Sequence, residues 1–459
     1  MAHDAKTWIS NWNPEDDGFW KSEGKRIATR NLIWSILAEN IGFSIWLIWS
    51  VTAPRLNKVG FHYSTDELFT LVAVPGLVGS LMRFPYTFAV PRFGGRNWTM
   101  VSAALLFIPT LALAFLVTRP DTPFWLMATA AATAGLGGGN FASSMANISF
   151  FYPDREKGLA LGLNAAGGNI GVSTVQLLVP ILITMAWVNL NPSLPPTKLH
   201  LENAGLMWLP FIALAVFGAY RFMNNLAAQR SNFKDQLVIT GRKHTWIMAW
   251  LYIGTFGSFI GYSAAFPLLL KTQFPEVSAN LAFLGALVGS LARPLGGKLA
   301  DRIGGARVTF WSFLAMALAT LGVIHFLGDK SFAGFLCMFL VLFVTTGVGN
   351  GSTFRMIPVI FRKEKLREAE GKGPEALAAA HKTARLESAA VLGFVSAVGA
   401  CGGYLIPRSF GASIKATGSP LTALAGFLAF YATCVLITWS IYLRKSPAVA
   451  AGPRLAAEV

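Results

Sequence analysis

The sequence predicts an all-α membrane protein in which twelve transmembrane helices form two pseudo-symmetric six-helix bundles. Hydrophobic residues make up 54% of the 459 positions and charged residues only 13%, which differs strongly from an average soluble domain. Apolar windows of about twenty residues recur along the chain, and each is long enough to cross a hydrocarbon core of about 30 Å as a helix. One motif is written twice, half a chain length apart, which predicts two homologous halves.

The duplicated motif is an arginine inside an apolar run, followed by a second arginine, an apolar residue and a Gly-Gly pair. The first copy occupies residues 83–96 and the second residues 293–307. Arg83 and Arg293 begin the two copies, so the repeat distance is 210 positions (293 minus 83). Each half of the chain therefore contributes one arginine embedded in apolar sequence.

The order of the apolar segments gives the expected domain boundaries. Spans are expected at roughly 31–53, 67–91, 98–118, 123–150, 157–187, 204–222, 245–269, 277–300, 308–328, 332–360, 387–407 and 420–443. An even number of spans places both termini on one side of the membrane. The predicted parts are a cytoplasmic N-terminal tail (1–30), an N-terminal bundle (31–222), a cytoplasmic linker (223–244), a C-terminal bundle (245–445) and a cytoplasmic C-terminal tail (446–459).

The net charge of +16 reflects membrane orientation rather than a nucleic acid partner. Basic residues concentrate in alternate loops and in the N-terminal tail, which is the positive-inside pattern. We therefore expect a multi-pass protein of the cytoplasmic (inner) membrane, embedded in the lipid bilayer. We expect it to be a monomer and to bind no nucleic acid. Residues 1–30 contain no apolar core, so no cleavable signal peptide is expected. Residues 363–385 predict a helical excursion on the cytoplasmic surface.

No cofactor or metal is predicted. The three cysteines fall in apolar spans, and their odd number and spacing argue against a disulfide framework and a metal site. The six histidines are scattered singly, and there is no phosphate-binding loop or dinucleotide fingerprint. An enzyme acting on a small oxyanion through a metal is therefore disfavoured.

Spacing places Arg83 and Arg293 deep in the membrane. Each lies nine residues before an arginine that begins a cytoplasmic loop, which at a rise of 1.5 Å corresponds to roughly 13 Å of depth. A buried arginine costs at least about 2.5 to 3.5 kcal/mol, so it should face a cavity or a partner. The alternatives are a structural ion pair and a site for a small anion.

The supply of carboxylates favours an anion. Glu39 is the only carboxylate clearly inside a predicted span, whereas Arg83, Arg293 and Arg355 all lie within spans. A planar, weakly hydrated guanidinium offers paired donors to a planar oxyanion such as nitrate. Two such groups, one from each half, would clamp one anion near the midplane.

Glycine-rich spans also recur in the second half: Gly137 and Gly139 recur as Gly349 and Gly351, 212 positions later (349 minus 137), and Gly168 and Gly171 recur as Gly399 and Gly402. Small residues at such spacings let helices pack closely, either statically or so that they slide during transport. Asn169 has no counterpart in the second half, and its amide either lines a cavity or forms an interhelical hydrogen bond. The glycines singled out for packing or gating are Gly137, Gly139, Gly168, Gly171, Gly349 and Gly351.

Two stretches, residues 137–151 and 349–354, resemble the nitrate signatures of the NarK-type nitrate/nitrite porters, a branch of the major facilitator superfamily. The similarity extends from Trp12 to Trp439. The resemblance implies the major facilitator fold and nitrate and nitrite as substrates. It also implies a set of substrate-binding residues: Arg83, Arg293, Asn169, Tyr252, Phe141 and Phe256.

The aromatic assignments rest on the resemblance alone, because residue type and spacing by themselves indicate core packing for Tyr252 and Phe256. The two lie one helical turn apart, so one helix face can present both. Glu39 and Arg355 depart from the family pattern, in which uncharged residues are expected. We interpret them as a buried pair that locks two spans; the alternative is that Glu39 titrates and couples a proton.

The predicted function is nitrate/nitrite antiport by alternating access. Exchange of equal charges avoids the cost of moving an anion against the membrane potential, about 2.3 kcal/mol per 100 mV. Proton symport through Glu39 is the alternative, and an anion channel is a remoter one. A nitrate sensor is disfavoured, since no signalling domain follows the last span.

Overall fold

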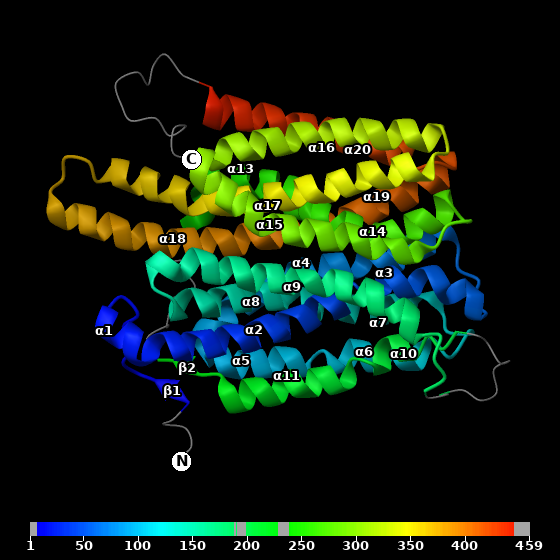
Figure 1. The fold of residues 1–459 in the computed structure, drawn as a ribbon, viewed down its shortest axis with the longest axis horizontal. Helices are drawn as coiled ribbons and strands as arrows, with labels where there is room; N and C mark the ends of the chain where they lie inside the picture. The colour runs from blue at the N-terminus through cyan, green and yellow to red at the C-terminus, as the bar shows by residue number, and fades with distance from the viewer. Residues whose placement is uncertain (1–6, 188–189, 191–198, 228–237, 445–459) are drawn as a thin grey trace. The chain divides into compact units, whose positions relative to one another are not determined.

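The computed structural model describes residues 7–187, 190, 199–227 and 238–444. The start of the predicted N-terminal tail, the middle of the predicted linker and the predicted C-terminal tail lie outside the described residues. Within them the chain is almost entirely helical, apart from a short parallel pairing of β1 (Trp8–Ile9) with β2 (Asn225–Leu226) (Figure 1).

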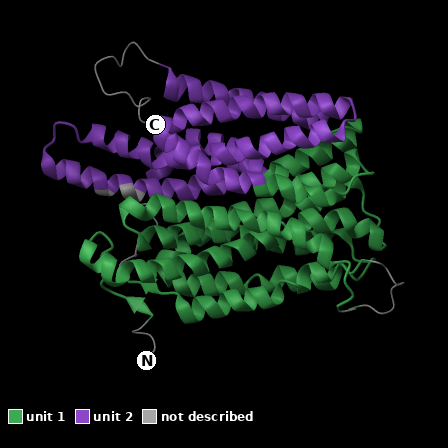
Figure 2. Ribbon diagram, in the orientation of Figure 1, with its two compact units in different colours: residues 1–231, 260–287, 403–420 green, residues 232–259, 288–402, 421–459 purple. Residues whose placement is uncertain are grey.

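The chain divides into two compact units (Figure 2). Unit 1 contains residues 1–231, 260–287 and 403–420, and unit 2 contains residues 232–259, 288–402 and 421–459. Two segments from the second half of the sequence thus pack with the helices of the first half. The predicted bundle boundaries remain predictions.

Unit 1 is built mainly from helices of the first half of the sequence. The helix α2 packs against α8 and α9, and α4 packs against α8. The elements are α1 (Asp17–Phe19), η1 (Trp20–Gly24), α2 (Lys25–Trp46), α3 (Ile48–Thr52), η2 (Ala53–Val59), α4 (Thr65–Phe93), α5 (Gly95–Ala104), α6 (Phe107–Leu116), α7 (Phe124–Thr133), α8 (Leu136–Phe151), α9 (Asp154–Leu182), α10 (Asn203–Leu206) and α11 (Leu209–Phe222).

In unit 2, α17 packs against both α16 and α18. Its elements are η3 (Val238–Gly241), α13 (Lys243–Tyr252), η4 (Ile253–Gly257), α16 (Gly305–Gly328), α17 (Phe332–Glu368), α18 (Pro374–Ala400), α20 (Leu421–Ile437) and η6 (Thr438–Leu443). Most of α15 (Phe283–Ile303) belongs here too. Nearly all of α14 (Ser258–Gln273) and α19 (Gly402–Thr417), with η5 (Ala279–Ala282), belongs to unit 1.

The prediction of many membrane-crossing helices is confirmed, but the count of twelve is only partly matched. Ten helices of the described chain are long and apolar enough to cross a membrane, and the bent pair Asp17–Trp46 and Ile48–Val59 makes eleven. The span predicted at 123–150 is divided between α7 and α8, which are 10 and 16 residues long. The predicted excursion is an extension of α17 to Glu368 followed by the start of α18 at Pro374.

The duplicated motif ends its helix in the same way in both halves. Gly94 ends α4 with φ at 85°, and Gly304 ends α15 with φ at 94°. Residues with a Cβ rarely adopt this left-handed backbone, so glycine is favoured at both positions. At the other end of α4, Ser64 and Glu67 form a reciprocal capping box. The arginine helices are therefore limited by local sequence, which fixes the distance from each turn to the deep arginine.

Candidate anion-binding site

Arg83 is held inside unit 1 by a backbone carbonyl and two aromatic rings. The residue is fully buried, and its Nε donates a hydrogen bond to the carbonyl oxygen of Gly138 at 3.1 Å. The guanidinium carbon lies 4.6 Å from the ring centroid of Phe141 and 5.3 Å from that of Trp46. Cation–π contacts of this kind are strongest where the cation is desolvated. They orient the guanidinium without neutralising its charge.

Arg293 has a related environment in unit 2. It is 4% exposed, and its guanidinium carbon lies 5.4 Å from the ring centroid of Phe354 on α17. Phe354 in turn lies 6.2 Å from Tyr252, measured between ring centroids. In each half, therefore, the deep arginine of the duplicated motif lies over a phenylalanine of the glycine-rich helix.

Tyr252 and Phe256 lie together on one face, as their spacing predicts. Their rings stack with centroids 5.4 Å apart and planes 21° from parallel, and both residues are fully buried. Between them the helix widens into the π-turn η4, which ordinary helical spacing does not predict. Such π-turns occur frequently at functional sites. This turn lets two large rings stack beside the arginine region of unit 2.

Asn169 lies on α9 in unit 1 and is 1% exposed. Its amide oxygen is buried and accepts no hydrogen bond from any residue that the structure describes. The interhelical hydrogen bond that was the structural alternative is therefore not made by this oxygen. A buried acceptor usually has a partner, so the amide of Asn169 is available to a ligand or a water molecule.

Two further buried amides, besides that of Asn169, were not predicted from the sequence. Asn140 on α8 and Asn350 on α17 are 4% and 1% exposed. Neither end of either amide is hydrogen bonded within the described residues. The two positions are 210 apart (350 minus 140), the same distance as the arginines. That coincidence was the signal that would have identified them.

The predicted packing glycines lie at close helix contacts. A Cβ at Gly137 would overlap the carbonyl oxygen of Gly42, and one at Gly171 would overlap that of Asn40, both on α2. A Cβ at Gly351 would overlap the carbonyl oxygen of Arg293 on α15. At Gly139 it would overlap the ring of Tyr86, at Gly168 the carboxylate of Glu39, and at Gly349 the side chain of Thr255.

Glu39 is a fully buried carboxylate on α2. It accepts hydrogen bonds from the Ser144 hydroxyl and, at 2.6 Å, from Nδ2 of Asn164, which also donates to Ser144 Oγ at 2.9 Å. Because Gly168 provides the space for this carboxylate, Glu39 packs against the residue preceding Asn169. The carboxylate of Glu39 therefore packs against α9 directly next to Asn169, a predicted substrate-binding residue.

The expected buried pair between Glu39 and Arg355 is wrong. The side chain of Arg355 is 49% exposed, and its Nε donates to Oδ1 of Asp301 at 2.5 Å. Arg355 sits one turn beyond Gly351 on α17, and Asp301 lies in the last turn of α15. Arg355 thus forms an exposed ion pair with Asp301, near the end of the duplicated motif, and not a buried pair with Glu39.

The six predicted substrate-binding residues fall into two groups. Arg83, Phe141 and Asn169 lie in unit 1, and Arg293, Tyr252 and Phe256 lie in unit 2. Arg83 directly contacts Phe141, and Tyr252 stacks on Phe256. The contact of Arg293 with Phe354 adds a residue that the resemblance did not include. Each unit thus carries one buried guanidinium with aromatic neighbours.

The chain is similar to known proteins over most of its length. Residues 36–369 match the Major Facilitator Superfamily model. The chain is 45% identical to the nitrate/nitrite transporter NarU of Escherichia coli over 95% of this chain and 96% of that protein. It is 38% identical to the probable nitrate/nitrite antiporter NarK2 of Thermus thermophilus, over 97% and 99%.

Solved structures show the same fold at low sequence identity. The inward-open xylose transporter XylE from Escherichia coli matches with a TM-score of 0.67 at 14% identity, covering 93% of this chain and 98% of that one. A D-xylose-proton symporter matches with a TM-score of 0.64 at 16% identity, over 90% and 97%. Identities this low carry the fold and not the substrate. With the family match and the long, closely similar relatives, the chain belongs to the NarK-type nitrate/nitrite porters of the Major Facilitator Superfamily.

Proposed function

We propose that this membrane protein carries nitrate and nitrite by alternating access, exchanging one anion for the other. The observation that supports the proposal most strongly is that each unit contains a buried arginine over an aromatic ring, Arg83 over Phe141 and Arg293 over Phe354. The high identity to nitrate/nitrite transporters supports the same substrates.

The chemistry of the site fits a small, flat, weakly hydrated anion. A guanidinium presents two parallel N–H donors, which match two oxygens of nitrate or nitrite. The aromatic faces of Phe141 and Phe256 would cover the anion and exclude water, which strengthens the charge-assisted bonds in a low dielectric. The amide of Asn169 and the hydroxyl of Tyr252 would supply further hydrogen bonds. Larger tetrahedral anions match neither the fork nor the flat faces.

The charge of the proposed site favours exchange. If one anion were shared by Arg83 and Arg293, its departure would leave two like charges to repel each other, which would raise the barrier for the empty carrier to change state. A bound anion of either kind lowers that barrier. Because nitrate and nitrite carry equal charge, exchange also avoids about 2.3 kcal/mol per 100 mV of work against the membrane potential. The carrier would therefore change between its inward-open and outward-open states only with an anion bound.

Proton symport is the second candidate, and the environment of Glu39 favours it. Ser144 Oγ and the Asn164 amide can each act as donor or acceptor. Nδ2 of Asn164 donates to Glu39, while Oδ1 of Asn164 is buried and accepts no hydrogen bond from the described residues. Both groups donate to the carboxylate, and rotation of either one would allow it to accept a hydrogen bond from a carboxylic acid. Because Arg355 pairs with Asp301, a structural ion pair with Arg355 does not account for the presence of Glu39 in this span.

The finer cellular assignments are part of the same proposal. Both termini would face the cytoplasm, since the basic loops and the basic N-terminal segment lie on one side by the positive-inside rule. The protein would act as a monomer in the cytoplasmic membrane, with no nucleic acid partner. The Thermus thermophilus relative is named an antiporter, which supports exchange.

Transport by purified protein in liposomes tests the coupling. Vesicles are loaded with nitrite or left empty, nitrate is added outside, and a pH-sensitive dye reports the lumen. Exchange predicts nitrate entry only into nitrite-loaded vesicles, with no change in internal pH. Nitrate entry into empty vesicles with acidification would establish symport and overturn exchange. Sustained current without a counter-anion or proton would identify a channel and overturn both.

A further inference from the structure

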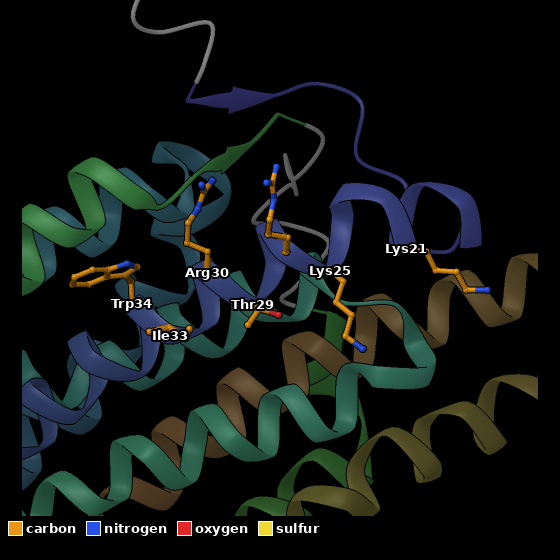
Figure 3. A pocket seen from close by; sticks show the side chains of 7 residues that line it. Lys21, Lys25, Thr29, Arg30, Ile33 and Trp34 are labelled. Atoms are coloured by element: carbon orange, nitrogen blue, oxygen red, sulfur yellow. The ribbon is translucent and has the colours of Figure 1, made fainter.

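The N-terminal helical run carries a basic stripe on one face. The helices α1, η1 and α2 follow one another without a break from Asp17 to Trp46. Side chains spaced about four residues apart lie on the same face of such a run. Seven of them line a surface hollow of about 510 Å³: Lys21, Lys25, Arg26, Thr29, Arg30, Ile33 and Trp34. Figure 3 shows Lys21 and Lys25 toward one end and Ile33 and Trp34 toward the other.

The hollow has an excess of positive charge. Four of its seven lining side chains are basic and none is acidic. Lys25 pairs with Glu156 at 3.2 Å, and Arg30 donates to the neutral amide oxygen of Asn224 at 2.8 Å. Lys21 and Arg26 form no ion pair with any residue in the described part of the chain. The local charge is therefore only partly balanced by the protein.

The other end of the hollow is apolar. Ile33 is 58% exposed, and Trp34 stacks on Phe222 of α11 with ring centroids 5.2 Å apart and planes 5° from parallel. At a rise of 1.5 Å per residue, Trp34 lies about 6 Å farther along the helix than Arg30. The predicted hydrophobic span begins directly after Arg30. With the span beginning where the sequence predicts, the basic groups would lie at headgroup level and the apolar pair at the start of the hydrocarbon region.

We propose that this face binds one anionic phospholipid. The phosphate would contact Lys21 and Arg26, and an acyl chain would lie along Ile33 and Trp34. Basic pockets beside transmembrane helices are suited to anionic headgroups. The order of charge and apolar surface matches that of a phospholipid, whereas free phosphate would make no use of the apolar end.

The position of the hollow predicts a consequence for the helices around it. Arg30 contacts Asn224, next to β2, and Trp34 contacts Phe222 at the end of α11. A lipid in this hollow would therefore stabilise the contact between α2 and the end of α11. Because α2 also carries the buried Glu39, the lipid would stabilise the helix that holds this acid.

Native mass spectrometry of the full-length, delipidated protein tests the proposal. Phosphatidylglycerol, phosphatidylcholine and inorganic phosphate are titrated separately. The test variant is Lys21→Gln with Arg26→Gln. The control is Lys58→Gln with Lys372→Gln, which removes the same charge at two exposed positions elsewhere. Circular dichroism and thermal unfolding establish that all variants are folded.

We expect one tightly retained phosphatidylglycerol, with weaker binding of phosphatidylcholine and none of inorganic phosphate. Each basic group near an anionic lipid contributes about fivefold, so the test variant should lose about thirtyfold in affinity while the control loses little. Equal affinity of wild type and test variant would overturn the proposal, as would equal retention of phosphatidylcholine or binding of phosphate alone. These outcomes do not depend on anion transport.

Discussion

Asp66, the second residue of α4, accepts a hydrogen bond from Nη1 of Arg408 on α19 at 2.9 Å, across 342 positions of sequence. Lys415 of α19 approaches the other carboxylate oxygen at 3.2 Å, and Arg408 also donates to Thr70 Oγ1 at 2.7 Å. All four residues belong to unit 1. A helix from the first half of the sequence is thus tied to one from the second half.

The Asp66–Arg408 pair should break and reform during transport, because alternating access requires each end of the carrier to open in turn. We expect Asp66→Arg and Arg408→Asp each to slow nitrate/nitrite exchange about tenfold, since each places like charges together. The double variant should recover at least half of the lost rate. Lys415→Gln is the control, because Lys415 is 70% exposed and its contribution should be small. A double variant no faster than the singles would contradict the interpretation.

Phe354 should contribute to anion affinity although it was not among the residues that the family resemblance implied. Its ring orients Arg293, so Phe354→Leu keeps apolar volume but removes the cation–π contact. A contact worth about 0.5 to 2 kcal/mol predicts a loss of affinity of roughly 2- to 30-fold. The apparent KM for nitrate in counterflow measures it. Phe326→Leu, on α16 and away from Arg293, should leave KM unchanged; an equal effect of both would indicate general loosening of the fold.

Glu39 separates the two coupling modes. Glu39→Gln keeps hydrogen-bonding groups beside Ser144 and Asn164, so exchange should continue within about threefold of the wild-type rate. Glu39→Ala should lower the free energy of unfolding by about 1 to 3 kcal/mol, because it strands buried polar groups. Counterflow at several external pH values provides the measurement. Loss of a pH-dependent uptake in Glu39→Gln, with counterflow intact, would favour symport instead.

The amides of Asn140 and Asn350 lack partners among the described residues, which predicts opposite effects on stability and activity. Replacing either by leucine removes a buried, unsatisfied polar group and should stabilise this state by about 1 to 3 kcal/mol. The same change should slow transport, since the other states of the cycle would lose a polar group. Thermal unfolding and exchange rates are measured on the same samples. Destabilised variants would indicate that water already satisfies these amides.

Much of the fold was predictable because it depends on local pattern. Apolar segments of membrane length give the spans, and the repeated Gly-Gly pair gives the left-handed residues Gly94 and Gly304 that end the arginine helices. Arg83 is fully buried, as expected for an arginine within an apolar span. These features need no knowledge of which helices touch. They were therefore accessible from the sequence alone.

The errors concern contacts between helices and breaks within them. Arg355 was expected to pair with Glu39, because both are charges in apolar spans, but a half-exposed Asp301 lies within reach on the neighbouring helix. The π-turn η4, which begins directly after Tyr252 and contains Phe256, was not predicted, because residue type does not reveal it. Phe354 was visible in the glycine-rich stretch, but only its distance to Arg293 distinguishes it from a core residue.

The central claim is that one planar anion is held by an arginine from each half of the chain. Isothermal titration of nitrate into purified wild type, Arg83→Lys and Arg293→Lys tests it most directly. Arg119→Lys is the control, an exposed arginine 3.8 Å from the ring of Phe115. We predict one nitrate per chain, a loss of about 10- to 150-fold in either buried variant because a charge-assisted hydrogen bond is removed, and no loss in the control. Wild-type affinity in either buried variant, or a stoichiometry of two in which each variant removes one site, would contradict the account.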